Sequence, residues 1–208
     1  MKKTNLKSGN KNTRQKTKML VTAAMLAGIA AVLMFFDFPV PFLPSFYKID
    51  FSELPVLIGT FMMGPAVGTV IEAIKILVKM LMKGSSTAGV GEIANFLIGC
   101  SFILPAGFIY RFKKTKKGAI IGLCAGTLTC VIVGCLLNAF VLLPLYAGMF
   151  GGMENVIKAG TKANSAITDL GTLVILATAP LNLIKCVSLS VITMLVYKPL
   201  SRFIKGNE

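Results

Sequence analysis

A small set of polar side chains interrupts the apolar segments of this 208-residue chain. Its members are Lys48, Asp50, Glu53, Asn95, Asn138, Asn182 and Lys185. Amide, carboxylate and ammonium groups together supply both hydrogen-bond donors and acceptors. A few such groups converging in a mostly apolar site are typical of small-molecule pockets. These residues therefore favour binding of a ligand that carries donors and acceptors of its own.

The residue types needed for most catalysis are missing from the sequence. The chain has no histidine, which excludes histidine acid–base chemistry, Ser-His-Asp triads and the common zinc sites. Its five cysteines form no CxxC pattern, and its eight acidic residues are dispersed. The glycine-rich segment GSSTAGVG at 84–91 lacks the lysine of a phosphate-binding loop. We expect no catalytic residue, metal or cofactor, and hence no enzyme.

The first of these polar residues lie in an aromatic, proline-rich stretch at 38–59, which reads FPVPFLPSFYKIDFSELPVLIG. Its four prolines forbid a continuous helix and favour extended backbone. Backbone of that kind is tolerated at membrane depth where it is buried in protein or lines a cavity. We interpret the stretch as an ordered lid, in which Phe46 and its aromatic neighbours favour a flat ring system as ligand. An interfacial aromatic anchor is the alternative.

Composition identifies the chain as an integral membrane protein. Hydrophobic residues make up 55% and charged residues 14%, and the mean hydropathy is +0.78. Several apolar windows of about twenty residues show that the hydrophobicity is divided into spans, and the length leaves room for five or six helices, of which the placement of basic residues favours six. We expect these at 18–36, 52–63, 65–82, 91–112, 117–145 and 169–200, with an outer loop between Met149 and Thr168. The predicted fold class is an all-α polytopic membrane protein.

The net charge of +14 is a topology signal. Of the 22 basic residues, 15 lie in three short segments, at the N-terminus, at 111–117 and at 198–205. Six spans place all three segments on one face, which the positive-inside rule makes cytoplasmic. We therefore expect a basic cytoplasmic tail at 1–18, a six-helix domain at 19–208 in the cell membrane, cytoplasmic termini and no nucleic-acid partner.

Some intramembrane residues have a packing interpretation beside a functional one. Glu72, Lys75 and Lys79 share a helical face and predict a buried charge network more than a ligand contact. A mid-span asparagine is often hydrogen-bonded to a neighbouring helix. In the first helix the small residues Ala23, Ala27 and Ala31 form a ridge that lets another helix approach closely. That helix belongs either to the same chain or to a separate subunit.

Five blocks carry a family resemblance. They are the stretch at 38–59, GPAVG at 64–68, GVGEIANF at 89–96, NAFVLLPLY at 138–146 and PLNLIK at 180–185. With these blocks in this order, nearly all of the chain after residue 18 resembles the riboflavin-binding S components of energy-coupling factor (ECF) transporters.

The resemblance implies six helices, with riboflavin bound in an outward-facing pocket under the first loop. It also implies that Glu53, Asn138, Asn182 and Lys185 contact the flavin. The partners implied are a membrane-embedded coupling subunit, docked on the ridge of Ala23, Ala27 and Ala31, and two ATPase subunits. Three alternatives stay open: an S component for another vitamin, a facilitator that works without ATPases and, as the least favoured, a small membrane enzyme.

Overall fold

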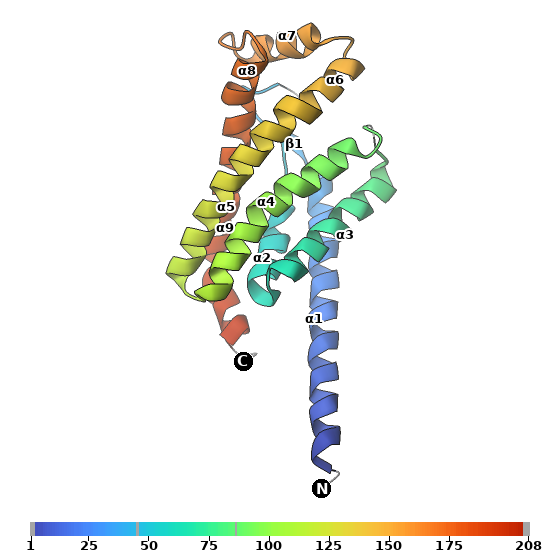
Figure 1. Cartoon of the computed structure of the whole chain (residues 1–208), viewed down its shortest axis with the longest axis vertical. Coiled ribbons are helices and arrows are strands. Elements are labelled where there is room, and N and C mark those ends of the chain that lie inside the picture. The colour runs from blue at the N-terminus through green and yellow to red at the C-terminus, as the bar shows by residue number, and fades with distance from the viewer. Residues whose placement is uncertain (1–2, 45, 86, 206–208) are drawn as a thin grey trace.

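The protein, described here by a computed structural model that covers residues 3–44, 46–85 and 87–205, is a bundle of helices (Figure 1). Helix α1 (Lys3–Phe35) leads into a lid with two short strands, β1 (Phe38–Pro39) and β2 (Lys48–Ile49). Helices α2 (Glu53–Met63), α3 (Pro65–Lys83), α4 (Val90–Phe112) and α5 (Lys116–Leu137) follow. The N-terminal end of α1, the α4–α5 turn and the C-terminal end of α9 (Ala179–Lys205) lie toward the same, lower end of Figure 1.

Helices α2 and α3 are separated by a single residue. Gly64 has a φ of 98°, a backbone angle that residues with a Cβ rarely adopt. Pro65 follows at the start of α3, where its missing N–H costs no helical hydrogen bond. Gly64 and Pro65 thus end one helix and begin the next, and the two helices pack against each other.

Helices α4 and α5 approach closely along a glycine ridge. A Cβ added at Gly122 would lie 2.7 Å from the carbonyl oxygen of Ala106, and one at Gly126 would meet the carbonyl of Phe102. Because glycine has no side chain, the two backbones pack in direct contact, as is common between membrane helices. The glycines of α5 thus bring α4 and α5 into close contact.

Two long helical segments each contain a π-helical turn next to a proline. One consists of α5, the π turn η1 (Asn138–Leu142) and α6 (Leu143–Met149). The other consists of α8 (Leu170–Leu173), the π turn η2 (Val174–Thr178) and α9. Pro144 and Pro180 come just after these turns, and each lacks the N–H that would bond to the carbonyl four residues earlier, which lies within the π turn. A wider turn relieves the clash of the proline ring with that carbonyl.

The segment between Met149 and Thr168, expected as an outer loop, contains a helix instead. Helix α7 (Met153–Ala163) buries Val156 and Gly160, which lie one turn apart, against α6 and α8. Glu154 in its first turn and Lys162 in its last turn both suit the helix dipole. In Figure 1, α6, α7 and α8 form the upper end of the molecule.

The all-α membrane fold class is confirmed. Four described segments are long and apolar enough to cross a bilayer: Gln15–Phe35, Val90–Phe112, Lys116–Met149 and Leu170–Val196. Helix α2 is apolar but short, and α3 carries several charged residues, so neither meets that description. The predicted count of six spans is compatible with this arrangement and stays a prediction.

The small residues of α1 pack inside the chain. Ala23, Ala27 and Ala31 are all buried, because α1 lies against α2 and α3 on that side. The expectation that this ridge docks a separate subunit does not fit the structure, since other parts of the same chain cover its methyl groups. Ala24 and Gly28, one residue further on, are exposed instead, and a Cβ at Gly28 would meet nothing within 4 Å.

Candidate functional site

The part of the lid stretch that precedes α2 is a short hairpin that covers one end of the bundle, and this hairpin is called the lid from here on. Its strands pair antiparallel, with Phe38 opposite Ile49 and Pro39 opposite Lys48. The ammonium group of Lys48 lies 3.2 Å from a carboxylate oxygen of Asp37, which ties the second strand to the end of α1. The non-helical backbone predicted for the stretch at 38–59 is thus found up to its strand β2, whereas its last residues from Glu53 on begin α2, with Pro55 in the first turn of that helix.

Beneath the lid is a cavity of about 250 Å³. The lid closes it on one side, and α3, α4, η1, α6 and α9 supply the other walls. Phe46 brings an aromatic wall, because its ring centroid lies 4.7 Å from that of Tyr47 and 5.8 Å from that of Tyr146. The polar lining residues are Lys48, Lys79, Thr87, Glu92, Asn95, Asn138, Asn182 and Lys185. The cavity therefore combines a cluster of tilted aromatic rings with hydrogen-bonding groups.

Tyr47 connects the lid to both π turns. Its hydroxyl lies 2.6 Å from the hydroxyl of Thr178 in η2, and it also donates to Oδ1 of Asn138 in η1 over a longer 3.5 Å. Burial raises the pKa of Tyr47 to about 12, so the phenol stays protonated at neutral pH. A neutral phenol can therefore hold the lid closed over the cavity.

Asn138 and Asn182 each use only part of their hydrogen-bonding capacity within the protein. Nδ2 of Asn138 donates to the carbonyl of Gly134 at 2.8 Å, and Nδ2 of Asn182 donates to the carbonyl of Thr178 at 3.0 Å. Each amide nitrogen has a second N–H. In the described part of the chain, no protein group donates to Oδ1 of Asn182. Both amides thus retain hydrogen-bonding capacity on the cavity wall.

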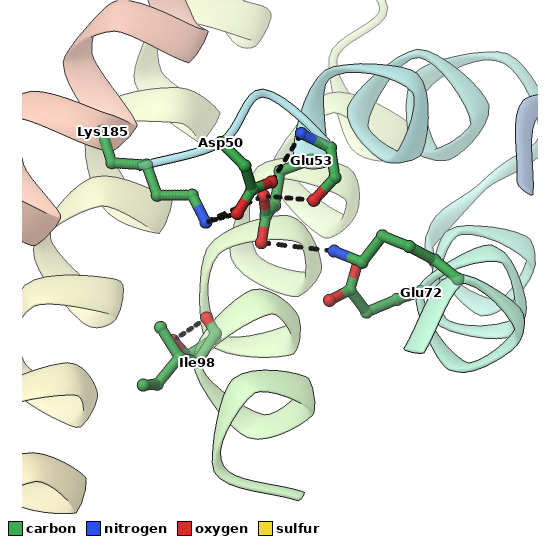
Figure 2. A network of polar contacts seen from close by, with 8 residues as sticks. Asp50, Glu53, Glu72, Ile98 and Lys185 are labelled. Atoms are coloured by element: carbon green, nitrogen blue, oxygen red, sulfur yellow. Dashed lines mark hydrogen bonds and ion pairs between the residues drawn. The ribbon is translucent and has the colours of Figure 1, made fainter. Parts of the chain in front are cut away.

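A network of charged side chains lies behind the cavity (Figure 2). Lys185 of α9 points toward the lid and α2, with its ammonium 3.0 Å from Glu53 and 3.4 Å from Asp50. Lys75 of α3 lies 3.3 Å from Glu53 and 2.7 Å from Glu72. Backbone and side-chain donors of Ser52 bind Asp50 at 2.8 Å and Glu53 at 3.2 Å.

This network explains how charges persist inside the bundle. A lysine within a span costs about 2.5–3.5 kcal/mol on insertion scales, and such residues face a partner or a cavity. Lys185 does both, because it lines the cavity and shares two carboxylates. An ammonium group has three donors, so two ion-pair contacts leave one available to a ligand. The buried network predicted on α3 is confirmed for Glu72 and Lys75.

Six of the eight predicted binding residues line the cavity: Phe46, Lys48, Asn95, Asn138, Asn182 and Lys185. The other two, Asp50 and Glu53, are not among its lining residues and instead hold Lys185 in place. Sequence reasoning missed Tyr47, Lys79, Thr87, Glu92 and Tyr146 as lining residues. Tyr47 and Tyr146 do fall within the lid stretch and the NAFVLLPLY block, so their aromatic character was an available signal.

The arrangement offers binding rather than reaction chemistry, and comparison with known families agrees. The model of the family described as "ECF transporter, substrate-specific component" matches residues 18–197. This chain belongs to that family. Its members are transporter subunits, so the chain is a membrane transport protein and not an enzyme.

Relatives of this S component are similar over nearly their whole length. The riboflavin transporter RibU of Staphylococcus aureus (strain TCH60) is 40% identical over 191 residues, which cover 92% of this chain and 94% of that protein. The riboflavin transporter FmnP of Bacillus subtilis (strain 168) is 35% identical over 194 residues, or 93% of this chain and 97% of the relative. A solved S component of a bacterial ECF transporter is 37% identical and has a TM-score of 0.70, covering 91% of this chain and 99% of its own.

Proposed function

We propose that this S component captures riboflavin from outside the cell in the cavity under the lid. The observation that carries the proposal is the pairing of an aromatic lid with Asn138, Asn182 and Lys185 on the cavity wall. Relatives that are named riboflavin transporters support the same substrate. The flat ring system of a flavin suits the aromatic wall, and its hydroxylated side chain suits the polar lining.

Each polar residue has a role that its chemistry allows. Amide groups such as those of Asn138 and Asn182 pair with the pyrimidine-like edge of the ring, which carries both carbonyls and an N–H. Lys185 donates its remaining N–H to a ligand carbonyl or hydroxyl. Glu53 and Asp50 act through Lys185, because they hold its ammonium at 3.0 and 3.4 Å. They are positioning residues in this proposal.

The lid has to move for a flavin to enter. The cavity of about 250 Å³ lies slightly below the roughly 300–1,000 Å³ of typical ligand pockets. Tyr47 and Phe46 face the cavity from the lid, so an outward movement of the hairpin enlarges the space on that side. The bond between Tyr47 and Thr178 then re-forms or is replaced by contacts to the ligand.

A fluorescence titration tests the substrate. Riboflavin fluorescence is followed as purified protein in detergent is added, with thiamine and biotin as competitors. We expect saturable quenching near one flavin per chain, unaffected by either competitor. Competition by thiamine or biotin would indicate an S component for another vitamin. An absence of quenching by well-folded protein would refute the proposal.

Substitutions test the position of the site. Asn182→Ala should weaken riboflavin binding at least tenfold, because it removes an amide from the cavity wall and leaves ligand groups unpaired. The matched control is Asn155→Ala, which removes an exposed amide of α7 that binds the carbonyl of Phe150. Equal affinity of Asn182→Ala and the wild type would mean that flavin binds elsewhere.

Transport in this proposal requires a coupling subunit and two ATPase subunits. Both termini and the loop at 111–117 lie on the cytoplasmic side. We place the docking ridge on the exposed residues Ala24 and Gly28 of α1, in place of the buried alanines. Gly28→Trp should then abolish ATP-dependent uptake and leave riboflavin binding intact. Uptake that survives ATP depletion would indicate a stand-alone facilitator instead.

A further inference from the structure

An apolar groove runs between α5 and α9 on the outside of the bundle. Its volume of about 680 Å³ exceeds that of the cavity under the lid. The two helices lie side by side and antiparallel along the lower left of Figure 1. Leu123 is buried at the floor, whereas Leu128, Val191 and Leu195 on the rim are exposed by 64%, 54% and 75%. The groove is therefore open to whatever surrounds the protein.

The length of the groove corresponds to one leaflet of a bilayer. On α5 its lining extends from Lys116 to Val131, which at 1.5 Å per residue is about 22 Å. A bilayer is about 40–45 Å thick with its headgroups, so one leaflet is about 20–22 Å. Lys116 lies at the end of the helix, and Val131 then lies near the midplane. A lipid chain lying in the groove would thus reach from the headgroup region to the end of its own leaflet.

The lining of the groove is apolar along its length and cationic at one end. Lys116 is its one charged lining residue. It belongs to the basic segment that also contains Arg111, Lys113, Lys114 and Lys117. The sequence has no acidic residue between Glu92 and Glu154, nor between Asp169 and Glu208, so neither α5 nor α9 offers a carboxylate to this segment. A negative charge placed at this end of the groove meets no repulsion from the two helices.

We propose that the α5–α9 groove is a binding site for an anionic phospholipid, with one acyl chain lying in the groove and the phosphate at Lys116. The apolar length matches a single leaflet, and the cation lies where the headgroup of such a lipid would be. Burial of each methylene of the chain contributes favourably, although a membrane offers other chains the same environment. Selectivity therefore comes from the charge at Lys116, and zwitterionic phospholipids bind less well.

Tryptophan fluorescence offers a direct test, because the chain contains no tryptophan of its own. Leu195→Trp places one probe on the exposed rim near the cationic end of the groove. Phe108→Trp places a comparison probe on α4, exposed near the same basic segment but outside the groove. The full chain is reconstituted in vesicles of phosphatidylcholine that contain a small fraction of a bromine-labelled lipid, which quenches a nearby tryptophan. Val191→Trp, also on the rim, replaces Leu195→Trp if that variant does not fold.

At Leu195→Trp we expect bromine-labelled phosphatidylglycerol to bind about fivefold better than bromine-labelled phosphatidylcholine, the effect of one basic residue near the surface. Adding Lys116→Gln should remove this preference. The matched control is Lys117→Gln, which removes the same charge from an exposed neighbour that does not line the groove and should preserve the preference. Phe108→Trp should show a smaller preference than Leu195→Trp.

Three results would overturn the proposal. Equal quenching by the two labelled lipids at the rim would mean that the groove holds ordinary boundary lipid. An equal loss in Lys116→Gln and Lys117→Gln would mean that the whole basic segment attracts anionic lipid without a defined site. If neither lipid quenched the rim probe, the groove would be covered by protein, such as a second copy of this chain.

Discussion

Replacing Lys75 by methionine should destabilise the protein strongly, because Lys75 is the shared cation of two buried carboxylates. Its side chain and that of Glu72 are both fully buried, with 2.7 Å between their charged atoms. Among the described residues, Glu72 forms no other ion pair, whereas Glu53 also has Lys185 at 3.0 Å. The substitution Lys75→Met therefore leaves one carboxylate fully unpaired, not two.

The expected loss of stability follows from this one unpaired carboxylate. Removing one partner of a buried ion pair costs about 3–5 kcal/mol. For a chain of this length, each kcal/mol changes the melting temperature by about 2–4 °C, so the decrease should be on the order of 10 °C. The measurement is thermal unfolding of the purified protein in detergent, followed by circular dichroism. Lys83→Met, which removes an exposed lysine at the end of the same helix, should change the melting temperature by far less.

A second substitution distinguishes the effect of an unpaired charge from that of lost packing. The double variant Lys75→Met/Glu72→Leu removes the unpaired carboxylate as well, and replacing a whole buried pair by apolar residues is often neutral. We expect its melting temperature to return to near that of the wild type. If the double variant were no more stable than Lys75→Met, the loss would come from packing and not from an unpaired charge.

Two further substitutions address the site itself. Gly134→Ala should lower ligand affinity about tenfold without unfolding the protein, because the new methyl would lie 2.8 Å from Nδ2 of Asn182. The control in the same titration is Gly148→Ala, whose new methyl would have no atom within 4 Å. For Tyr47, the raised pKa means that its contribution to stability is complete below pH 10 and is lost as the pH rises toward 12. Tyrosinate absorbance at 295 nm should therefore show a late-titrating group that is absent from Tyr47→Phe, and a wild type without it would contradict the burial of the Tyr47 phenol.

The bounds of most helices followed from local sequence signals. Gly64 and Pro65 marked the break between α2 and α3, and the predicted helices at 65–82 and 91–112 correspond to Pro65–Lys83 and Val90–Phe112. Glycine, proline and the length of apolar runs act over a few residues, so they can be interpreted without knowledge of the tertiary structure. The lid followed for the same reason.

The features that depend on packing were not predictable in the same way. Small residues occur on two faces of α1, and only the position of α2 and α3 decides that Ala27 is buried and Gly28 exposed. Helix α7 was missed because its flanking glycines and short length resemble a loop, although Val156 and Gly160 have helical spacing. The polar residues of the site could be selected by type. Which of them line the cavity and which orient Lys185 depends on the tertiary structure, and local sequence does not show it.

The two π turns, η1 and η2, lie between a base that contains α4 and α5 and a cap of α6, α7 and α8. Below them, α4 and α5 are held together by backbone contact at Gly122 and Gly126. Above them, α6, α7 and α8 contact one another in sequence, and the lid reaches α6 through the ring of Phe46, which lies 5.8 Å from that of Tyr146. We expect these two wider turns to act as a pair of hinges, about which the cap tilts while α4 and α5 stay together. Amide hydrogens at 138–142 and 174–178 should accordingly exchange faster with solvent than those of α4, and ligand binding should slow them.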